Sequence, residues 1–406
     1  MQPILKHALQ EIYPLLIILC LHILNYISFF SLIIIYLLYC LYNRLTLTIS
    51  VKYNTSNITL NNILANCPSI LKPTYKPHFF LSNSILQLFA LNFTSNYKYP
   101  KEYTENIQYE PVENTGIHVV YYSYKEIPTN KSNPILILFP GLTGNHTDTY
   151  AKNIIHEAIL NGFQIIIYQM RVLTNINNIH FNKANETYNL FEDVAIAMNY
   201  LHNKHKTNSF YAIGCSFGAL QLTGYLGSEY NSKDKFIKAA VSLSNPYDVL
   251  TSSKICKDTI YDDYLLWNLR TNFIKNFLYC NKSLTKYQIN INKIMQCDDL
   301  HTFDMEFTRK VQGYAHADDY YRNISVTKNI KNISIPILFI HAMDDNITTP
   351  RAIPYDDIEH NINSVSIWVS KGAHLCYIEQ GKGLFELKQW VSTPAVEFVK
   401  AASRLS

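Results

Sequence analysis

Two glycines bracket a single serine in Tyr-Ala-Ile-Gly-Cys-Ser-Phe-Gly-Ala-Leu, residues 211–220, although the 406-residue chain contains only 12 glycines. An apolar run precedes Gly214, and a second apolar run, compatible with a helix, follows Gly218. When a strand turns sharply into a helix, residues two places before and after the turn meet neighbouring backbone, so glycine is needed there. The spacing therefore predicts a strained strand–serine–helix turn that exposes the Ser216 hydroxyl above a helix N-terminus.

From about residue 115 onward, short apolar runs alternate with amphipathic stretches, which is typical of a mostly parallel sheet flanked by helices. We expect strands over residues 117–122, 135–139, 163–168, 210–213, 239–243, 335–341 and 365–369. We expect helices over residues 149–161, 191–204, 219–229 and 394–403. Residues 247–334 interrupt this alternation with a Tyr-rich helical insertion, which we interpret as a cap over a binding cleft.

A serine hydroxyl becomes a nucleophile when a base accepts its proton and an acid orients that base. For a serine on such a turn, the acid and then the histidine follow later in the chain. Asp344 and Asp345 come directly after one expected strand, and His374 comes after the next. Because parallel strands place their carboxyl ends at one edge of a sheet, we expect these groups to meet Ser216. The base is then His374, and the acid is Asp344 or Asp345.

The oxyanion formed during acyl transfer needs two backbone N–H donors. We expect one from Phe217, directly after the serine, and the other from Leu142 in the loop Leu-Phe-Pro-Gly-Leu-Thr-Gly-Asn, residues 138–145. The eight cysteines are widely spaced and form no CxxC pair, so we expect reduced thiols and neither a metal nor another cofactor. The net charge of +4 and the absence of Lys/Arg runs predict no nucleic-acid partner.

Residues 13–42 form an apolar run without Asp, Glu, Lys or Arg. As a helix, about 30 residues would extend roughly 45 Å, which exceeds the ~30 Å hydrocarbon core of a bilayer. The run is longer than the apolar region of a signal peptide and lacks a small-residue cleavage site. We expect one tilted membrane-spanning helix, and the alternative is a re-entrant hairpin near Asn25 and Tyr26.

This run divides the chain into an anchor over residues 1–45, a tether and lead-in segment over 46–115, and a catalytic domain over 116–406. Basic residues after the run favour a catalytic domain on the cytosolic side of the membrane. The sequence does not define the compartment, and among membranes an endomembrane such as the endoplasmic reticulum is favoured.

Several motifs, in order along the chain, resemble the membrane-anchored lipases and esterases of the AB-hydrolase type-4 family. The resemblance runs from about Cys67 to the C-terminus and rests on Cys67-Pro68, LFPGLTGN, GCSFG, ISIPILFIHAMDDN and GAHLCYIE. It implies an α/β-hydrolase fold with a helical cap and an N-terminal transmembrane helix. It also implies the catalytic triad Ser216, Asp345 and His374, because the second acid matches the family's catalytic position. One departure is Val172, where the family's Asn-x-Arg-Gly loop has glycine.

That family includes animal monoacylglycerol and phospholipid lipases and fungal medium-chain fatty-acid ethyl ester synthase/esterases. The sequence therefore predicts a membrane-anchored serine hydrolase that cleaves or transfers fatty acyl groups through an acyl-enzyme. Its expected substrates are acylglycerols, phospholipids or fatty-acid ethyl esters, its expected partner is the membrane, and protein partners are not indicated. The alternative is a non-catalytic membrane or assembly subunit on a retained hydrolase fold.

Overall fold

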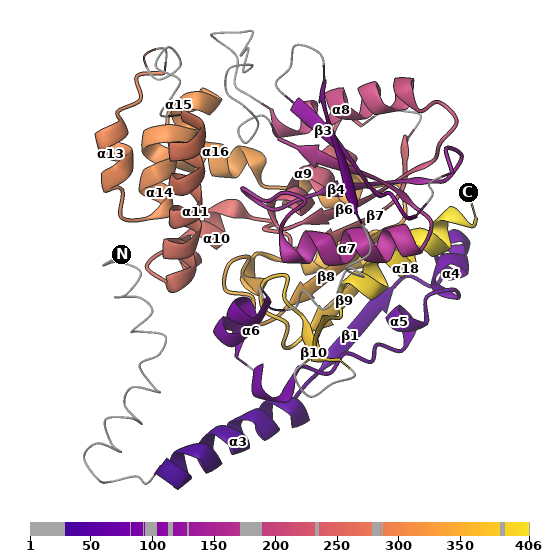
Figure 1. Ribbon diagram of the computed structural model, residues 1–406, viewed down its shortest axis with the longest axis horizontal. Coiled ribbons are helices and arrows are strands. Elements are labelled where there is room, and N and C mark those ends of the chain that lie inside the picture. The colour runs from indigo at the N-terminus through magenta and orange to yellow at the C-terminus, as the bar shows by residue number, and fades with distance from the viewer. Residues whose placement is uncertain are drawn as a thin grey trace.

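The computed structural model describes residues 29–81, 83–91, 93, 104–112, 117–127, 130–170, 189–231, 235–277, 285, 287–381 and 386–405. A nine-stranded sheet lies at its centre, in the order β1-β9-β8-β7-β6-β4-β5-β3-β2 (Figure 1). Its strands are β1 (Ile49–Tyr53), β2 (Glu105–Val112), β3 (Ile117–Tyr124), β4 (Ile135–Phe139), β5 (Gln164–Gln169), β6 (Phe210–Cys215), β7 (Ile237–Leu243), β8 (Ile337–Ala342) and β9 (Ser364–Val369). A separate two-stranded sheet pairs β10 (Ile378–Gln380) with β11 (Leu387–Gln389).

The strand pairing gives the sheet a parallel centre and antiparallel edges. Strands β4 to β9 pair in parallel, whereas β3 joins β5, β2 joins β3 and β1 joins β9 in antiparallel fashion. Strand β5 lies on one side of β4 and the next strand, β6, lies on its other side, so the direction in which strands are added to the sheet reverses at β4. This is the strand order of the α/β-hydrolase fold, as expected. All seven expected strands are present as β3 to β9, and β1 and β2 extend the sheet into the expected lead-in segment.

Helices cover both faces of the sheet (Figure 1). One face carries α4 (Ile58–Leu64), α7 (Thr149–Leu160) and α18 (Ser392–Ser403), and the other carries α8 (Leu190–Lys204), α9 (Phe217–Leu226) and α17 (Tyr355–His360). In β4, Leu136 and Leu138 join the first core while Ile135, Ile137 and Phe139 join the second. Both faces being buried explains why the central strands are apolar throughout rather than alternating.

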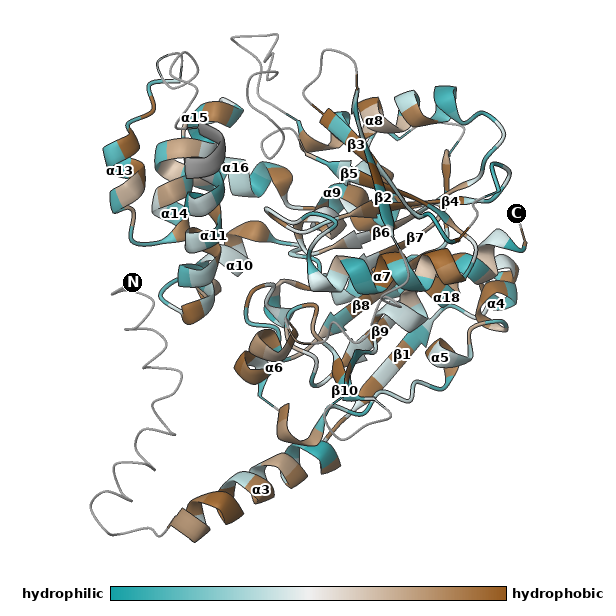
Figure 2. Cartoon of the chain, in the orientation of Figure 1, coloured by the Kyte–Doolittle hydropathy of each residue, from teal (hydrophilic) through white to brown (hydrophobic). Residues whose placement is uncertain are grey.

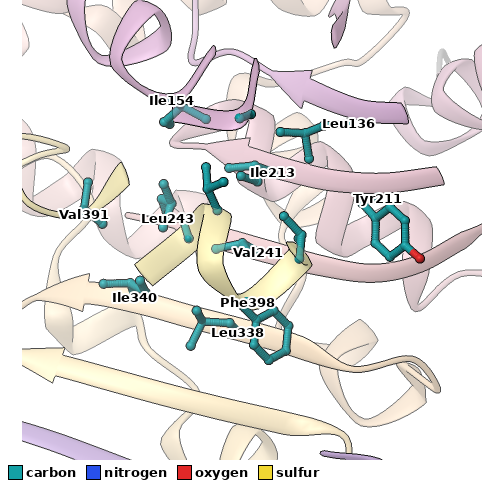
Figure 3. Packing of buried hydrophobic residues seen from close by; sticks show 14 of the residues in the cluster. Leu136, Ile154, Tyr211, Ile213, Val241, Leu243, Leu338, Ile340, Val391 and Phe398 are labelled. Atoms are coloured by element: carbon teal, nitrogen blue, oxygen red, sulfur yellow. The ribbon is translucent and has the colours of Figure 1, made fainter. Parts of the chain in front are cut away.

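The first core is shown in Figure 3, where Phe398 of α18 packs against side chains of the central strands. Leu338 lies beside its ring, and Val241 and Ile213 belong to the same cluster. All four side chains are fully buried. This packing fixes the strands whose carboxyl ends carry the candidate site.

Between β7 and β8 the chain forms a group of helices, called the cap below, which lies at one end of the sheet (Figure 1). Its elements are α10 (Val249–Cys256), α11 (Ile260–Phe277), α13 (Ile291–Gln296), α14 (Leu300–Phe303), the π-helix η4 (Asp304–Thr308), α15 (Arg309–Gln312), α16 (Ala317–Ile324) and the 3₁₀-helix η5 (Thr327–Asn332). The cap has an apolar core of its own, in which Leu266, Phe303 and Phe307 are buried. Shorter elements elsewhere are α5 (Pro68–Leu71), η1 (Phe79–Leu81), α6 (Ser84–Leu91) and η6 (Pro350–Ala352).

Helix α3 (Phe29–Leu45) precedes β1 and points away from the body of the protein (Figure 1). Its surface is largely apolar (Figure 2), and most of its large hydrophobic side chains are exposed. The hydroxyl of Tyr36 donates to the carbonyl of Phe80 at 2.6 Å, which ties α3 to η1. Of the expected membrane span, residues 13–28 lie outside the described residues. Within the described part, no helix combines the length and apolarity that crossing a membrane requires.

Candidate active site

The serine turn lies between β6 and α9. Ser216 has φ 53° and ψ −120°, a strained conformation for a residue with a side chain. A Cβ on Gly214 would lie 2.6 Å from the Cα of Ala219, and one on Gly218 would overlap the carbonyl oxygen of Phe139. Both glycines are therefore required by neighbouring backbone, as the spacing predicts.

The structure brings the expected nucleophile, base and acid together. His374 Nε2 lies 2.9 Å from Ser216 Oγ, and His374 Nδ1 lies 2.8 Å from Asp345 Oδ2. The Asp345 side chain is fully buried. It also accepts hydrogen bonds from the backbone N–H groups of Ile347 and Thr348, both at 2.9 Å, and from the Thr348 hydroxyl at 2.7 Å. The acid is thus held rigidly against one side of the imidazole.

The charge of Asp345 is set by opposing effects. Burial by itself would raise the pKa of this carboxyl, but His374, His341 and the hydrogen bond from Thr348 together lower it to about 2. Asp345 therefore remains an anion and accepts the Nδ1 proton of His374. The lone pair of Nε2 then faces the Ser216 hydroxyl, which is the tautomer required to remove its proton.

The neighbouring acid, Asp344, binds backbone N–H groups instead of the imidazole. Its Oδ1 accepts from the N–H groups of Gly372 and Ala373 at 2.8 and 2.9 Å, the two residues that precede His374. Its Oδ2 is buried without a hydrogen-bond partner among the described residues, and burial raises the pKa of this carboxyl. Residue types alone leave the two acids equivalent, whereas the geometry assigns Asp345 to the imidazole and Asp344 to the backbone of the histidine loop.

The loop after β4 presents a limited choice of oxyanion donors. Gly141 N–H donates to the Tyr150 hydroxyl at 2.9 Å, Gly144 N–H to the Gly141 carbonyl at 2.9 Å, and Asn145 N–H to Asp148 Oδ2 at 3.0 Å. These three amides are therefore occupied. The N–H groups of Leu142 and Thr143 donate to no acceptor in the described part of the chain, and of these two residues Leu142 lines the same cavity as Ser216 and Phe217.

The N–H of Phe217 is also available, because it opens α9 and has no acceptor one turn earlier. The expected pair of donors, Leu142 and Phe217, thus flanks the nucleophile. The helix dipole of α9 adds favourable electrostatics for an oxyanion at this point.

Two residues that shape this loop were missed by sequence reasoning. Tyr150, at the start of α7, accepts from Gly141 and hydrogen-bonds to Asp148, and burial raises the pKa of both side chains. A Cβ on Gly144 would collide with the Tyr150 hydroxyl. The sequence signal for these contacts was Gly144 followed by an Asp and a Tyr at the start of the next helix. Neither Asp148 nor Tyr150 belongs to a motif with a recognised spacing, so the signal was not used.

Two of the open spaces between described residues meet at Ser216. The first, called the apolar cavity, lies under the cap and is lined mainly by apolar side chains such as Met170, Phe217, Leu269, Phe303, Phe307 and Val311. Its described wall also carries four buried polar residues, Ser252, Asp304, Gln312 and Thr348. Asp304 accepts hydrogen bonds from the Tyr321 and Thr308 hydroxyls. Val172, the departure noted above, lies outside the described residues.

The second space, called the polar cleft, lies on the other side of the nucleophile. It is lined by His374 and Leu142 together with a set of polar side chains, namely Thr143, Asn145, Thr147, Asp148, Thr149, Tyr150, Tyr264, Asn268 and Asn272. His374 lines this cleft but not the apolar cavity. The catalytic groups thus separate two compartments of different chemistry.

The strand order, the strained serine turn and the placement of acid and histidine after successive strands define an α/β hydrolase. The sequence profile of a family described as "Alpha/beta hydrolase of unknown function (DUF915)" matches residues 174–294. Est1E from Butyrivibrio proteoclasticus aligns in structure with a TM-score of 0.44 and 13% sequence identity, over 74% of this chain and 99% of that one.

Among its relatives, an "Abhydrolase domain-containing protein" of Dictyostelium discoideum is 28% identical, over 85% of this chain and 86% of that protein. The "Monoacylglycerol lipase" of Saccharomyces cerevisiae is 28% identical, over 77% of this chain and 70% of the lipase. Human "Phospholipase ABHD3" is 26% identical, over 61% and 59%. The chain is thus an α/β-hydrolase superfamily protein whose relatives bear lipase and esterase names.

The paired acids should respond differently to substitution. Asp345→Asn should lower kcat by ~10⁴, because an amide facing Nδ1 favours the wrong imidazole tautomer. Asp344→Asn retains an oxygen acceptor for the N–H groups of Gly372 and Ala373. It should lower kcat less than about tenfold, because a neutral amide oxygen accepts these hydrogen bonds more weakly than a carboxylate but leaves neither donor unsatisfied. Asp344→Ala, which leaves both N–H groups unsatisfied, should fall between these values. Equal losses for Asp344→Asn and Asp345→Asn in steady-state ester hydrolysis would contradict this division.

Tyr150→Phe should impair the oxyanion loop without disturbing the fold. The variant removes the acceptor of Gly141 N–H, so we expect kcat to fall by up to ~10², with little change in KM, on the scale of a displaced oxyanion donor. Tyr75→Phe is the matched control, because the buried Tyr75 hydroxyl has no hydrogen-bond partner among the described residues. Kinetics should be accompanied by thermal melting; a large loss of stability with unchanged kcat would assign Tyr150 a structural role only.

Proposed function

We propose that this protein is a membrane-associated serine hydrolase that cleaves fatty acyl groups from carboxylic esters. The observation that carries the proposal is the continuous hydrogen-bonded row Ser216–His374–Asp345, with Oγ–Nε2 and Nδ1–Oδ2 distances of 2.9 and 2.8 Å. The amides of Leu142 and Phe217 beside it, which donate to no acceptor among the described residues, supply the remaining requirement for acyl transfer, stabilisation of an oxyanion.

In the proposed reaction, His374 removes the Ser216 proton as Oγ attacks the ester carbonyl carbon. Leu142 and Phe217 hold the resulting oxyanion, and His374 returns the proton to the departing alkoxide oxygen. Water, deprotonated by His374, then attacks the acyl-enzyme and releases the fatty acid, which restores Ser216. Asp345 stabilises the imidazolium in both steps.

The apolar cavity supports a fatty acyl substrate, because it offers a hydrocarbon chain a largely apolar surface next to the nucleophile. The names of the relatives, a monoacylglycerol lipase and a phospholipase, agree with this class. A "Medium-chain fatty acid ethyl ester synthase/esterase 2" of Saccharomyces cerevisiae is a further relative, 24% identical over 65% of this chain and 61% of that protein. Transfer of the acyl group to an alcohol instead of water would use the same residues.

The second candidate is a non-catalytic membrane or assembly subunit. A protein without catalytic activity would not need the strained backbone of Ser216, the lowered pKa of the buried Asp345 carboxyl and the alignment of the His374 imidazole between them. Their joint presence favours the enzyme.

Association with a membrane is supported by apolar surface on one side of the molecule. Exposed side chains of α3 are followed by exposed Phe80 in η1 and Phe89 in α6. An apolar groove between α6 and α11 continues this surface and includes Leu88 and Tyr264, which also line the polar cleft. We therefore propose that substrate enters from a bilayer, with the apolar run of residues 13–42 as the anchor and the catalytic domain on the cytosolic side.

The central test is covalent labelling of Ser216. A fluorophosphonate probe should label the detergent-solubilised wild-type protein, because the activated hydroxyl attacks phosphorus as it attacks a carbonyl. Ser216→Ala should abolish labelling and ester hydrolysis while membrane association and thermal melting stay unchanged. Hydrolysis that persists in Ser216→Ala would refute the mechanism, and an unlabelled, inactive wild type would favour the non-catalytic subunit.

Chain length provides an independent test of the acyl class. Each buried methylene contributes about 0.8 kcal/mol, so kcat/KM for p-nitrophenyl esters should rise severalfold per CH₂ from acetate to medium chains until the cavity is full. The same series on Ser216→Ala measures background hydrolysis. A preference for acetate over octanoate would contradict a fatty acyl substrate even if Ser216 were the nucleophile.

A further inference from the structure

We infer that helix α6 has two functional faces: an outer face that binds a lipid surface, and an inner face that positions the loops of Asp345 and His374. Contact with lipid holds α6 in place and thereby raises turnover. The inference rests on the proposed function and deepens it, because it names a docking surface and connects that surface to the triad. The surface belongs to the segment that precedes the catalytic domain, and the cap is not the element that binds lipid.

Hydrogen bonds connect α6 to the loop that carries the catalytic acid. The Tyr261 hydroxyl, in the first turn of α11, lies 3.0 Å from Ser84 Oγ at the start of α6. The same hydroxyl accepts from the side-chain amide of Asn346 at 3.2 Å. Asn346 directly follows Asp345. The start of α6, the cap and the acid loop therefore meet at one buried tyrosine.

Apolar packing extends this contact to the loop of the histidine. Leu88 packs against the buried cluster that contains Ile347, two residues after the acid. It also packs against a second buried cluster, which contains Ala373, the residue before the catalytic histidine. The fully buried Gln87 accepts from the N–H of Ile378 at 3.3 Å, beyond the histidine. A helix of eight residues thus contacts the loops of both the acid and the base.

The histidine loop needs such support because its backbone is strained. Ala373, Leu375 and Tyr377 have φ of 50°, 61° and 44°. Residues with side chains hold these conformations only where surrounding contacts impose them. If the inner face of α6 withdraws, the loop can relax, and a displacement of His374 by about 1 Å costs up to ~10² in rate.

The outer face of α6 is apolar and exposed. Leu86 and Phe89 lie one turn apart and are 37% and 63% exposed, and Phe93 follows just beyond the helix at 71%. Figure 2 shows α6 as a mainly hydrophobic helix. The sequence has no Asp, Glu, Lys or Arg between Lys76 and Lys98. This face therefore matches an apolar partner and offers no charge for pairing with a polar one.

The neighbours of α6 favour a lipid surface as that partner. Helix α3 is tied to η1 by the hydrogen bond from Tyr36 to the Phe80 carbonyl, and η1 in turn contacts α6. Phe80 is itself 48% exposed. The sequence before α3 continues the uncharged apolar run back to residue 13. The membrane that would anchor this run lies beside η1 and α6, and exposed Phe and Leu side chains suit its interfacial region.

Lipid contact can change turnover because α6 is short. A helix of eight residues is marginal in water and depends on packing. A lipid surface buries Leu86 and Phe89 together only when α6 is folded in place. Since a ligand shifts an equilibrium towards the state that it binds better, lipid raises the population in which α6 supports both loops.

Fluorescence quenching tests the docking surface. Full-length Phe89→Trp, in phosphatidylcholine vesicles with brominated acyl chains, should lose more tryptophan emission than the wild type does, because bromine quenches only at contact. Leu160→Trp is the matched control, since Leu160 is 57% exposed and lies at the far end of α7 from the histidine loop. Its emission should match that of vesicles without bromine, after subtraction of the wild type.

Kinetics in the same phosphatidylcholine vesicles, without bromine, test the connection to the triad. With water-soluble p-nitrophenyl butyrate, the double variant Leu86→Ser/Phe89→Ser should lower kcat about tenfold and leave KM unchanged, on the scale of losing apolar burial. Phe89→Leu, which keeps an apolar side chain, should retain most of the activity. Leu88→Ala should also lower kcat, because it weakens the inner contacts. Leu160→Ser should leave kcat within about twofold of the wild type.

Three results would overturn the inference. The first is quenching of Phe89→Trp no greater than that of Leu160→Trp, and the second is an unchanged kcat in the double serine variant. The third is a loss of kcat in Trp267→Ser without one in the double variant, which would assign lipid contact to the cap, because Trp267 of α11 lines the same groove as Phe89. Thermal melting of each variant separates local from global effects. Ser216-dependent hydrolysis and co-sedimentation of the wild type with vesicles test the proposed function separately, so that function can hold while this inference fails.

Discussion

The contact between Gly218 and the end of β4 is the constraint on which the site depends. A Cβ at Gly218 would overlap the carbonyl oxygens of both Phe139 and Pro140, so the first turn of α9 lies directly against the start of the oxyanion loop. The nucleophile and the donors for its oxyanion are therefore positioned by one backbone-to-backbone contact rather than by flexible side chains. Since Gly214 meets Ala219 in the same way, the turn has no free space in which to relax. The φ of 53° at Ser216 is the conformation that this packing imposes.

The histidine loop is held by a comparable excess of contacts. Ala373, Leu375 and Tyr377 all have positive φ, which costs free energy at residues with side chains. Asp344 fixes the loop before His374, and the Gln389 side chain donates to the Leu375 carbonyl at 2.6 Å after it. Asp344 thus fixes the backbone of the loop that carries His374, and Asp345 fixes the orientation of its imidazole ring. Two adjacent carboxylates are tolerated because burial raises the pKa of Asp344 while His374 and its neighbours lower that of Asp345.

The sequence was sufficient where function depends on local backbone sterics or on position relative to strands. The glycine spacing around Ser216 and the positions of Asp345 and His374 after two apolar runs locate three strand ends, and the glycine-containing loop around Leu142 locates a fourth. It was insufficient where function depends on side chains that meet only in the fold. Tyr150 and Asp148 fix the oxyanion loop, yet they look like ordinary residues of a helix start. Strands β1 and β2 were missed because they are edge strands, whose sequences carry polar residues on the exposed side.

The same geometry relates the alcohol to both halves of the proposed reaction. His374 protonates the leaving oxygen during acylation and deprotonates the incoming one during deacylation, so both oxygens must occupy the same side of the acyl carbon. That side is the polar cleft. In the proposed reaction, water during hydrolysis and an alcohol during acyl transfer would therefore both approach the acyl carbon from the side of His374 Nε2, which lies 2.9 Å from Ser216 Oγ. Since the same imidazole handles the proton in both cases, the triad by itself does not distinguish hydrolysis from acyl transfer.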